Sequence, residues 1–403
     1  MNSKGASHLT ILMILSTLMA FASISTDLYL PALPIMQHAL HSNSGAIEWT
    51  ISGFLIGFSI SQLFWGPISD RYGRKRPIAM GLLFFIIGST GCALSTDISA
   101  MIFWRAVQAI GACASVVLAR AIVRDLYEGP RAAKMLSTLI TVMAIAPLVG
   151  PSVGGMILHV SSWRTIFWTL VGVGVLTLMA LGFLPESLPE SERKTDSLGR
   201  LFSHYGELLR HRHLMAYIGV GAFFYGGVYA YIAGTPFAYI TYYHISPQIY
   251  GLLFALGIIG IMVTNQINIH LIGINKERLL HVGVYLVATA SIFLIVDAWT
   301  GWGGLAGLVI PLFLFVSANG FIVANSISGA LSFFPQSAGS ASALLGSLQY
   351  GAGIICTALV GVFADGTPLP MAWIMALCAA GSILCLVVLR HENFKSQIVG
   401  STW

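Results

Sequence analysis

The sequence predicts an all-α membrane protein with twelve transmembrane helices. Hydrophobic residues make up 56% of its 403 residues and charged residues only 9%, whereas a soluble domain carries about 25% charged residues. Apolar runs of roughly 20 residues recur along the chain, which is the length that a helix needs to cross about 30 Å of hydrocarbon. A transmembrane β-barrel would instead show alternating segments of about 10 residues.

Each apolar run defines one expected membrane span. The first run is too long for a signal peptide and lacks a small-residue cleavage site, so we expect it to remain as a membrane helix. The spans are expected at 9–31, 47–69, 77–95, 98–121, 133–158, 164–184, 213–236, 248–270, 279–297, 303–326, 337–362 and 370–390.

The lysines and arginines indicate how these helices are oriented. If the N-terminus lies in the cytoplasm, all but two of the 20 lysines and arginines fall in cytoplasmic segments, as the positive-inside rule requires. The exceptions are Arg164 on the outer side and Arg105 within the fourth span. The sequence therefore predicts two cytoplasmic termini. The basic residues are therefore expected to set the orientation of the helices in the membrane and not to bind nucleic acid.

The longest polar stretch, 185–213, divides the chain into two halves of six spans. The expected parts are an N-terminal six-helix bundle at 1–190, a cytoplasmic linker at 191–212 and a C-terminal six-helix bundle at 213–403. Twelve spans in two halves are typical of a transporter built from repeats, with a substrate site near the middle of the membrane.

Two charged side chains fall well inside spans, Asp27 in the first and Arg105 in the fourth. At 1.5 Å per residue they lie about 6 Å and about 10 Å below the outer boundary, so they could pair if the helices adjoin. Pro31 and Pro34 are expected to mark the end of the first helix. A charge in hydrocarbon costs at least ~2.5–3.5 kcal/mol, which makes both residues functional candidates. The structural alternative leaves Asp27 wetted at the interface, where it only caps a helix end.

Further polar residues lie within the spans. Tyr225 and Tyr229 are four residues apart in the seventh span and therefore share a helix face. Gln108 lies in the fourth span and Asn319 in the tenth. Because lipid-facing amides are costly, some of these side chains should line a wet cavity. Ordinary interhelical hydrogen bonding accounts equally well for any single amide.

The loop between the second and third spans reads "GPISDRYGRKRP". It resembles the loop signature of the major facilitator superfamily, G-x-x-x-D-R-x-G-R-[KR]. The glycines would permit a tight turn and close helix approach, and the aspartate could bind a helix N-terminus or a neighbouring arginine. By resemblance this loop is a conformational latch and not a substrate site. The pattern is matched at Gly66, Asp70, Arg71, Gly73, Arg74 and Lys75.

The fourth span reads "RAVQAIGACA". It resembles the R-x-x-Q-G-x-G segment of proton-coupled drug transporters at Arg105, Gln108 and Gly111. It departs from that pattern at Ala109, where the family has glycine. In the family this arginine is associated with proton coupling.

The fifth span reads "APLVGPSVGG". It resembles the G-P-x-x-G-G antiporter signature at Gly150, Pro151, Gly154 and Gly155. Glycine and proline together predict a kinked helix with a flat, close-packing face. Kinking alone would also explain these residues.

Three further segments narrow the resemblance to the bicyclomycin/chloramphenicol-resistance (Bcr/CflA) branch of drug:proton antiporters. They are "STDLYLPALP" in the first span, "WRTIFW" at 163–168 and "FPQSAGSASALLG" at 334–346. The loop "GINKER" at 273–278 is only a faint echo of the first latch. The resemblance implies the major facilitator fold of two six-helix bundles.

The resemblance implies transport by alternating access. Asp27 is expected to bind proton and substrate in competition, with Arg105 and Gln108 involved in the coupling. Tyr225, Tyr229 and Asn319 are candidates for cargo contacts. The expected function is proton-coupled efflux of small, amphipathic or cationic compounds across the bacterial inner membrane. The alternative is proton-coupled uptake of a small polar metabolite such as a nucleoside.

Other classes lack support in the sequence. There is no HExxH, GxSxG or Walker motif and no sizeable soluble domain, so we expect neither an enzyme nor an ATP-driven pump. A sensor would need an added signalling domain. The five cysteines all fall inside spans without metal-ligand spacing, so no metal or other cofactor is expected. The expected partners are a small molecule, protons and the lipid bilayer, with the chain as a monomer and no nucleic acid bound.

Overall fold

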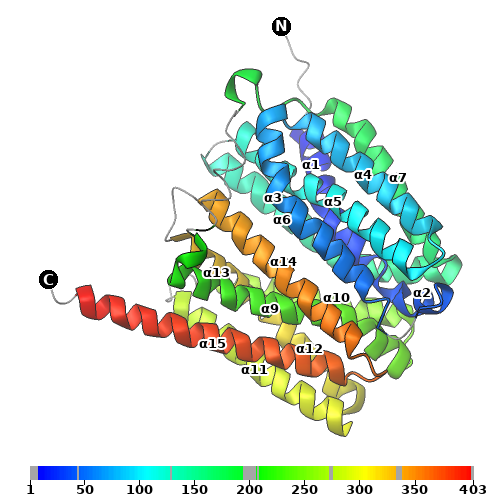
Figure 1. The fold of residues 1–403 in the computed structure, drawn as a ribbon, viewed down its shortest axis with the longest axis vertical. Helices are drawn as coiled ribbons and strands as arrows, with labels where there is room; N and C mark the ends of the chain where they lie inside the picture. The colour runs from blue at the N-terminus through cyan, green and yellow to red at the C-terminus, as the bar shows by residue number, and fades with distance from the viewer. Residues whose placement is uncertain are drawn as a thin grey trace. The chain divides into compact units, whose positions relative to one another are not determined.

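The computed structural model describes residues 8–42, 45–127, 129–193, 206, 208–271, 276–332 and 338–400. Within these ranges the chain is almost entirely helical and has no strand, and twelve helical stretches are long and apolar enough to cross a membrane (Figure 1). The predicted all-α class with twelve spans is confirmed. Most of the predicted linker, and parts of the segments 273–278 and 334–346, lie outside the described residues.

The chain forms two compact units. Unit 1 comprises Met1–Asp196 with Ile245–Ala255, and unit 2 comprises Ser197–His244 with Leu256–Trp403. The division into two bundles and a linker at 191–212 stays a prediction.

Unit 1 contains the first six spans. Its helical elements are α1 (His8–Asp27), η1 (Leu30–Ala32), α2 (Leu33–Ala39), α3 (Trp49–Tyr72), α4 (Lys75–Leu94), α5 (Ile98–Leu126), α6 (Gly129–Val160), α7 (Trp163–Ala180) and η2 (Leu181–Phe183).

Helix α5 is the centre of unit 1. It packs against α3 and α4 and also contacts α1 and α6, while α4 packs on α7 and α1 packs on α6. Glycines let these backbones approach closely: a Cβ at Gly57 of α3 would overlap the Ala106 carbonyl of α5, and one at Gly88 of α4 would overlap the Gln108 backbone. Small residues at helix contacts are the usual way to bring membrane helices together.

The first span is interrupted at Asp27 and does not end near Pro31. After α1 the chain forms η1 and then α2, and the whole stretch Leu9–Ala39 counts as one span. Pro31 and Pro34 lie at the second positions of η1 and α2, where the missing N–H costs nothing because no carbonyl of the same helix would accept it. The first helix α1 therefore ends four residues before Pro31, and the two prolines begin the short helices that follow it. The depth counted for Asp27 stays a prediction.

Unit 2 contains most of the remaining spans, of which only the first residues of α10 group with unit 1. The helices are α9 (Arg212–Pro236), continued by the π-helical turn η4 (Phe237–Tyr242), α10 (Pro247–His270), α11 (Lys276–Thr300), α12 (Gly304–Ser317), α13 (Asn319–Ser332), α14 (Ala338–Val362) and α15 (Leu369–Gly400).

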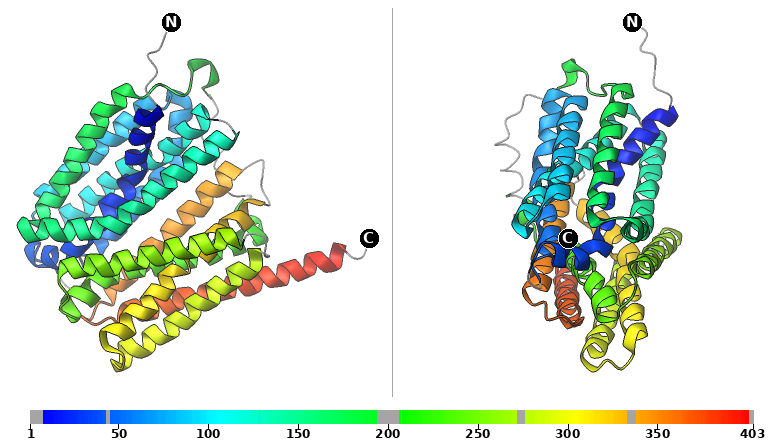
Figure 2. Two further views of the ribbon diagram at one scale, coloured as in Figure 1. Left: turned by 180° about the vertical axis from the view of Figure 1, so that it is seen from behind. Right: turned by 90° about the vertical axis from the view of Figure 1, so that its right-hand side faces the viewer.

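Helix α9 packs against α13, α14 and α15, and α11 lies along α15 (Figure 2). The tenth span was predicted as one helix, but it is broken at Ala318 between α12 and α13. The hydroxyl of Thr264 on α10 donates to the carbonyl of Ser317 at this break. A membrane helix tolerates such a break where neighbouring side chains satisfy the freed backbone groups.

The close α3–α5 contact gives a test of the packing. We expect Gly57→Ala to lower the free energy of unfolding by about 1–3 kcal/mol, because the added methyl overlaps the Ala106 carbonyl. Gly172→Ala on α7 is the matched control, since nothing lies within 4 Å of a Cβ there, and it should be neutral or slightly stabilising. Thermal unfolding in detergent measures both, and equal melting temperatures would contradict the packing account.

Candidate functional site

Arg105 is fully buried in the first third of α5, with 0% of its surface exposed. Its guanidinium lies over two aromatic rings, 4.2 Å from the Tyr29 centroid and 4.5 Å from the Phe54 centroid. Rings in this position attract a cation electrostatically, more strongly where water is excluded. Nη1 also donates to the Ser25 carbonyl at 3.0 Å and to the Gln108 side chain. The charge is therefore held by rings and neutral oxygen atoms.

The polar contacts around Arg105 extend to four helices. Gln108 Nε2 donates to Ser89 Oγ at 2.8 Å, and the hydroxyl groups of Tyr29 and Thr50 lie 3.1 Å apart. The sequence motif had placed Arg105 and Gln108 one turn apart on one helix, and the structure brings them into direct contact. We call this set the arginine cluster; it comprises Ser25, Tyr29, Thr50, Phe54, Ser89, Arg105 and Gln108.

The structure does not pair Asp27 with Arg105. Among the described residues no carboxylate oxygen lies within 4.0 Å of Arg105, and its Nε and Nη2 have no hydrogen-bond partner. The residue of α1 that reaches the guanidinium is Ser25, through its backbone carbonyl. Asp27 is 5% exposed, and within the described part of the chain its carboxylate has no ion pair or hydrogen bond.

Asp27 packs against α6, the helix that carries the antiporter-like signature. A Cβ at Gly150 would lie 3.0 Å from the Asp27 Cβ, and one at Gly154 would overlap the Leu28 carbonyl. Pro151 and Gly155 of the same signature are buried as well. The glycines of α6 therefore make room for the interruption of the first span. The first-span segment at Asp27 and the antiporter-like signature of α6, which are far apart in the sequence, thus lie in contact.

The latch residues are organised around Arg74, which is only 3% exposed. Its Nη1 donates to Asp70 Oδ1 and to Ser69 Oγ, both at 2.6 Å, and its Nε donates to Asp125 Oδ2 at 2.7 Å. Burial by itself lowers the pKa of Arg74, but the hydrogen bonds to Asp125 and Asp70 outweigh it and raise the pKa above its ordinary value. The guanidinium therefore stays charged and joins the ends of α3 and α5.

A third carboxylate, that of Glu186, binds the start of α4. It accepts hydrogen bonds from the backbone N–H groups of Arg74 at 2.7 Å and Lys75 at 3.1 Å, as expected for an anion at a helix N-terminus. Gly73 precedes them with φ +86°, and a Cβ there would lie 2.9 Å from Glu186 Oε2. The sequence left two partners open for Asp70, a neighbouring arginine or a helix N-terminus. In the structure Asp70 binds Arg74, and Glu186 binds the helix N-terminus.

The other two latch residues make little contact. Nothing lies within 4 Å of a Cβ at Gly66, so the prediction that this glycine permits close helix approach was wrong for unit 1. Arg71 is exposed, with its guanidinium 5.7 Å from the Tyr72 ring centroid.

The candidates in unit 2 form an aromatic row. The Tyr225 and Tyr229 ring centroids are 6.4 Å apart, as their shared face predicted, and Tyr350 of α14 lies 6.1 Å from Tyr229. Next to it, the buried Nε2 of Gln349 has no hydrogen-bond partner among the described residues. Asn319 is the half-buried first residue of α13, and in the described part of the chain no contact joins it to the tyrosines.

Sequence reasoning missed four residues of these sites. Asp125 and Glu186 complete the latch, but both lie more than 50 residues from Arg74 and no spacing rule connects them. Tyr350 reaches Tyr229 from a different helix. Glu48, immediately before α3, is 2% exposed, and its Oε2 has no partner in the described part of the chain. Its position could have been noticed in the sequence, because Glu48 is a carboxylate at the very start of an apolar run.

Comparison with known proteins agrees with these motifs. A model of the Major Facilitator Superfamily matches residues 15–357. A Bacillus subtilis protein described as an uncharacterized MFS-type transporter, YdgK, is 34% identical over 97% of this chain and 98% of its own length. The bicyclomycin resistance protein homolog of Haemophilus influenzae is 29% identical over 98% of this chain and all of its own.

The fold also matches solved structures. The xylose transporter XylE from Escherichia coli, in a partially occluded inward-open conformation, superposes with a TM-score of 0.72. The match covers 95% of this chain and 97% of XylE at 15% sequence identity, so it bears on the fold alone. With its twelve membrane-spanning helices and relatives of the bicyclomycin-resistance type, this chain belongs to the major facilitator superfamily of membrane transporters.

Proposed function

We propose that this transporter exports small amphipathic or cationic compounds across the bacterial inner membrane in exchange for protons. The observation that carries the proposal is the environment of Asp27. This carboxylate is buried in an interrupted membrane span, has no ion-pair partner among the described residues, and packs against the antiporter-like glycines of α6. The name of the Haemophilus influenzae relative, a bicyclomycin resistance protein homolog, supports export of an antibiotic-like compound.

Competition between proton and cargo for Asp27 would couple proton entry to cargo export. A bare carboxylate inside the membrane is costly, and either a proton or a cationic cargo removes that cost. When the site faces the periplasm, Asp27 takes a proton and releases cargo; when it faces the cytoplasm, it loses the proton and binds cargo. The proton gradient supplies the energy, so this scheme needs no cofactor. The distribution of lysines and arginines supports cytoplasmic termini.

Arg105 would tune this exchange without touching the cargo. Its positive charge is not neutralised by any carboxylate within 4.0 Å in the described chain, and Ser25, which it binds, is two residues from Asp27. Gln108 holds the guanidinium in place and is held in turn by Ser89.

The aromatic row of unit 2 is our candidate for contact with the cargo. Tyr225, Tyr229 and Tyr350 present neighbouring rings, which suit flat or cationic compounds. The unpartnered Nε2 of Gln349 could donate to a cargo oxygen. Asn319 is a weaker candidate because no contact among the described residues connects it to this row.

Replacing Asp27 tests the proposal directly. We expect Asp27→Asn to reduce compound-driven proton release at least tenfold, because asparagine cannot exchange a proton. Asp365→Asn, at an exposed carboxylate in the α14–α15 turn, is the matched control and should transport normally. Proton flux and compound uptake are measured in right-side-out and inverted vesicles, with and without a pH gradient. Undiminished proton release in the Asp27 variant, or uptake in place of export, would refute the proposal.

The latch gives a second test. We expect Asp125→Asn to lower the melting temperature and slow transport, because it removes one of the two carboxylates that neutralise the buried Arg74 guanidinium. Glu190→Gln should change neither, since that carboxylate is 87% exposed in its contact with Arg193 and surface ion pairs contribute little. Thermal unfolding and vesicle transport are measured side by side. If the Asp125 variant unfolds and transports like the wild type, the ion-pair network is not what holds the latch.

Glu48 makes the protein sensitive to pH at the start of α3. Burial raises its pKa from an ordinary value of 4.5 to about 7. Between these two pH values the folded protein therefore holds a proton that the unfolded chain has released. Stability should fall as the pH rises through this window and stay lower above pH 7.

We therefore expect Glu48→Gln to raise the melting temperature relative to the wild type at pH 8 and to leave it nearly unchanged at pH 5. Glutamine keeps the shape of the side chain but cannot ionise. Glu190→Gln again serves as control, because its wild-type side chain is already in water. Melting curves in detergent from pH 5 to 8 provide the measurement, and parallel curves for wild type and Glu48→Gln would show that Glu48 does not ionise in this range.

A further inference from the structure

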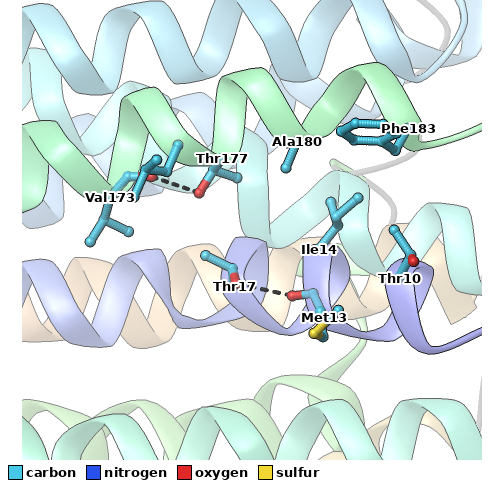
Figure 3. Close-up of a pocket in the computed structure, with 9 residues that line it drawn as sticks. Thr10, Met13, Ile14, Thr17, Val173, Thr177, Ala180 and Phe183 are labelled. Atoms are coloured by element: carbon cyan, nitrogen blue, oxygen red, sulfur yellow. Dashed lines mark hydrogen bonds between the residues drawn. The ribbon is translucent and has the colours of Figure 1, made fainter.

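A groove runs along the surface of unit 1 between α1 and α7 (Figure 3). Its walls are Thr10–Thr17 of α1 and Val173–Phe183 of α7 and η2, and its volume is about 340 Å³. Neither the motifs nor the proposed exchange at Asp27 uses these residues. The groove lies within two membrane spans, Leu9–Ala39 and Trp163–Phe183.

The walls of this groove offer few free hydrogen-bonding groups, even where threonines line it. Thr17 donates its hydroxyl to the Met13 carbonyl at 3.0 Å, and Thr177 donates to the Val173 carbonyl at 2.7 Å. These threonines satisfy their hydroxyl groups on their own helices. Leu176 and Phe183 are 66% and 71% exposed. The groove thus offers van der Waals contact and little hydrogen bonding, which suits a hydrocarbon chain and not a polar cargo.

The groove has the length of one lipid leaflet. The stretch Val173–Phe183 covers ten helical steps, or about 15 Å at 1.5 Å per residue, which is half of the ~30 Å hydrocarbon core. The groove lies beside the first residues of the first span and the last residues of the sixth span. One end of the groove therefore lies at a membrane surface and the other end near the middle of the membrane.

The surface end of the groove carries unpaired positive charge. Lys75 Nζ lies 3.5 Å from the carbonyl oxygen of Gly182, the residue before Phe183. In the described chain neither Lys75 nor Arg76 has a carboxylate within 4.0 Å. The nearby Arg74 is neutralised by Asp70 and Asp125, and Glu186 is engaged by backbone N–H groups. A phosphate group placed here would meet the Lys75 ammonium, which has only a neutral carbonyl as its described partner.

We propose that the groove binds one acyl chain of an anionic phospholipid, whose phosphate lies at Lys75. The chain would fill space that α1 and α7 do not fill themselves, since α1 packs mainly on α5 and α6 and touches α7 only lightly. Lipid would then support the helix that carries Asp27 at its other end.

The test counts lipids on the purified full-length protein by native mass spectrometry, with phosphatidylglycerol and phosphatidylcholine offered together. The wild type should retain one phosphatidylglycerol in preference to phosphatidylcholine. Ala180→Trp fills the groove and should lose this lipid whatever its headgroup. Ala380→Trp, at an exposed alanine of α15, is the matched control and should keep it. If Ala180→Trp fails to fold, Ala180→Leu replaces it.

Lys75→Gln separates the headgroup from the acyl chain. It should keep a lipid in the groove but reduce the preference for phosphatidylglycerol about fivefold. Equal lipid retention by Ala180→Trp and Ala380→Trp would overturn the proposal, as would equal retention of both headgroups by the wild type. Displacement of the lipid by a transported compound would also overturn it, because the groove would then be a path for cargo.

Discussion

A guanidinium without a carboxylate partner has to be held in a membrane helix by weaker groups, and unit 1 is arranged to do this for Arg105. Two rings cover its faces, a backbone carbonyl and an amide accept its hydrogen bonds, and these groups come from α1, the turn that follows it, α3 and α5 itself. Close approach of α3 and α4 to α5 depends on glycines such as Gly57 and Gly88. The same packing therefore buries the charge and builds the bundle.

Arg105 and Arg74 show two ways to bury the same group. At the end of the bundle Arg74 is paired with two carboxylates, so its charge is neutralised where the chain turns. Within the bundle Arg105 has no carboxylate within 4.0 Å among the described residues, and two of its nitrogen atoms have no hydrogen-bond partner there. The first arrangement joins the ends of two helices through ion pairs, whereas the second holds the guanidinium with rings and neutral oxygen atoms.

Much of the fold followed from the sequence, because apolar run length and the placement of lysine and arginine depend only on local composition. The motif residues were also identifiable, and Gln108 and Tyr229 met the partners that helical spacing gave them. The partners Asp125, Glu186 and Tyr350 were not, since each lies on another part of the chain and only packing brings it near. The break at Asp27 was missed because proline is equally compatible with ending a helix and with beginning the next one.

The contact between α6 and the interrupted first span has a consequence for how the sequence can vary. Gly154 meets the backbone carbonyl of Leu28 and not its side chain. The two positions therefore differ in mutational tolerance: the side chain at 28 is free of this constraint, whereas any side chain at 154 collides with an atom that no substitution at 28 can remove. A sequence library of this transporter should show an invariant glycine at 154 without covariation with position 28, whose side chain is limited by its own burial.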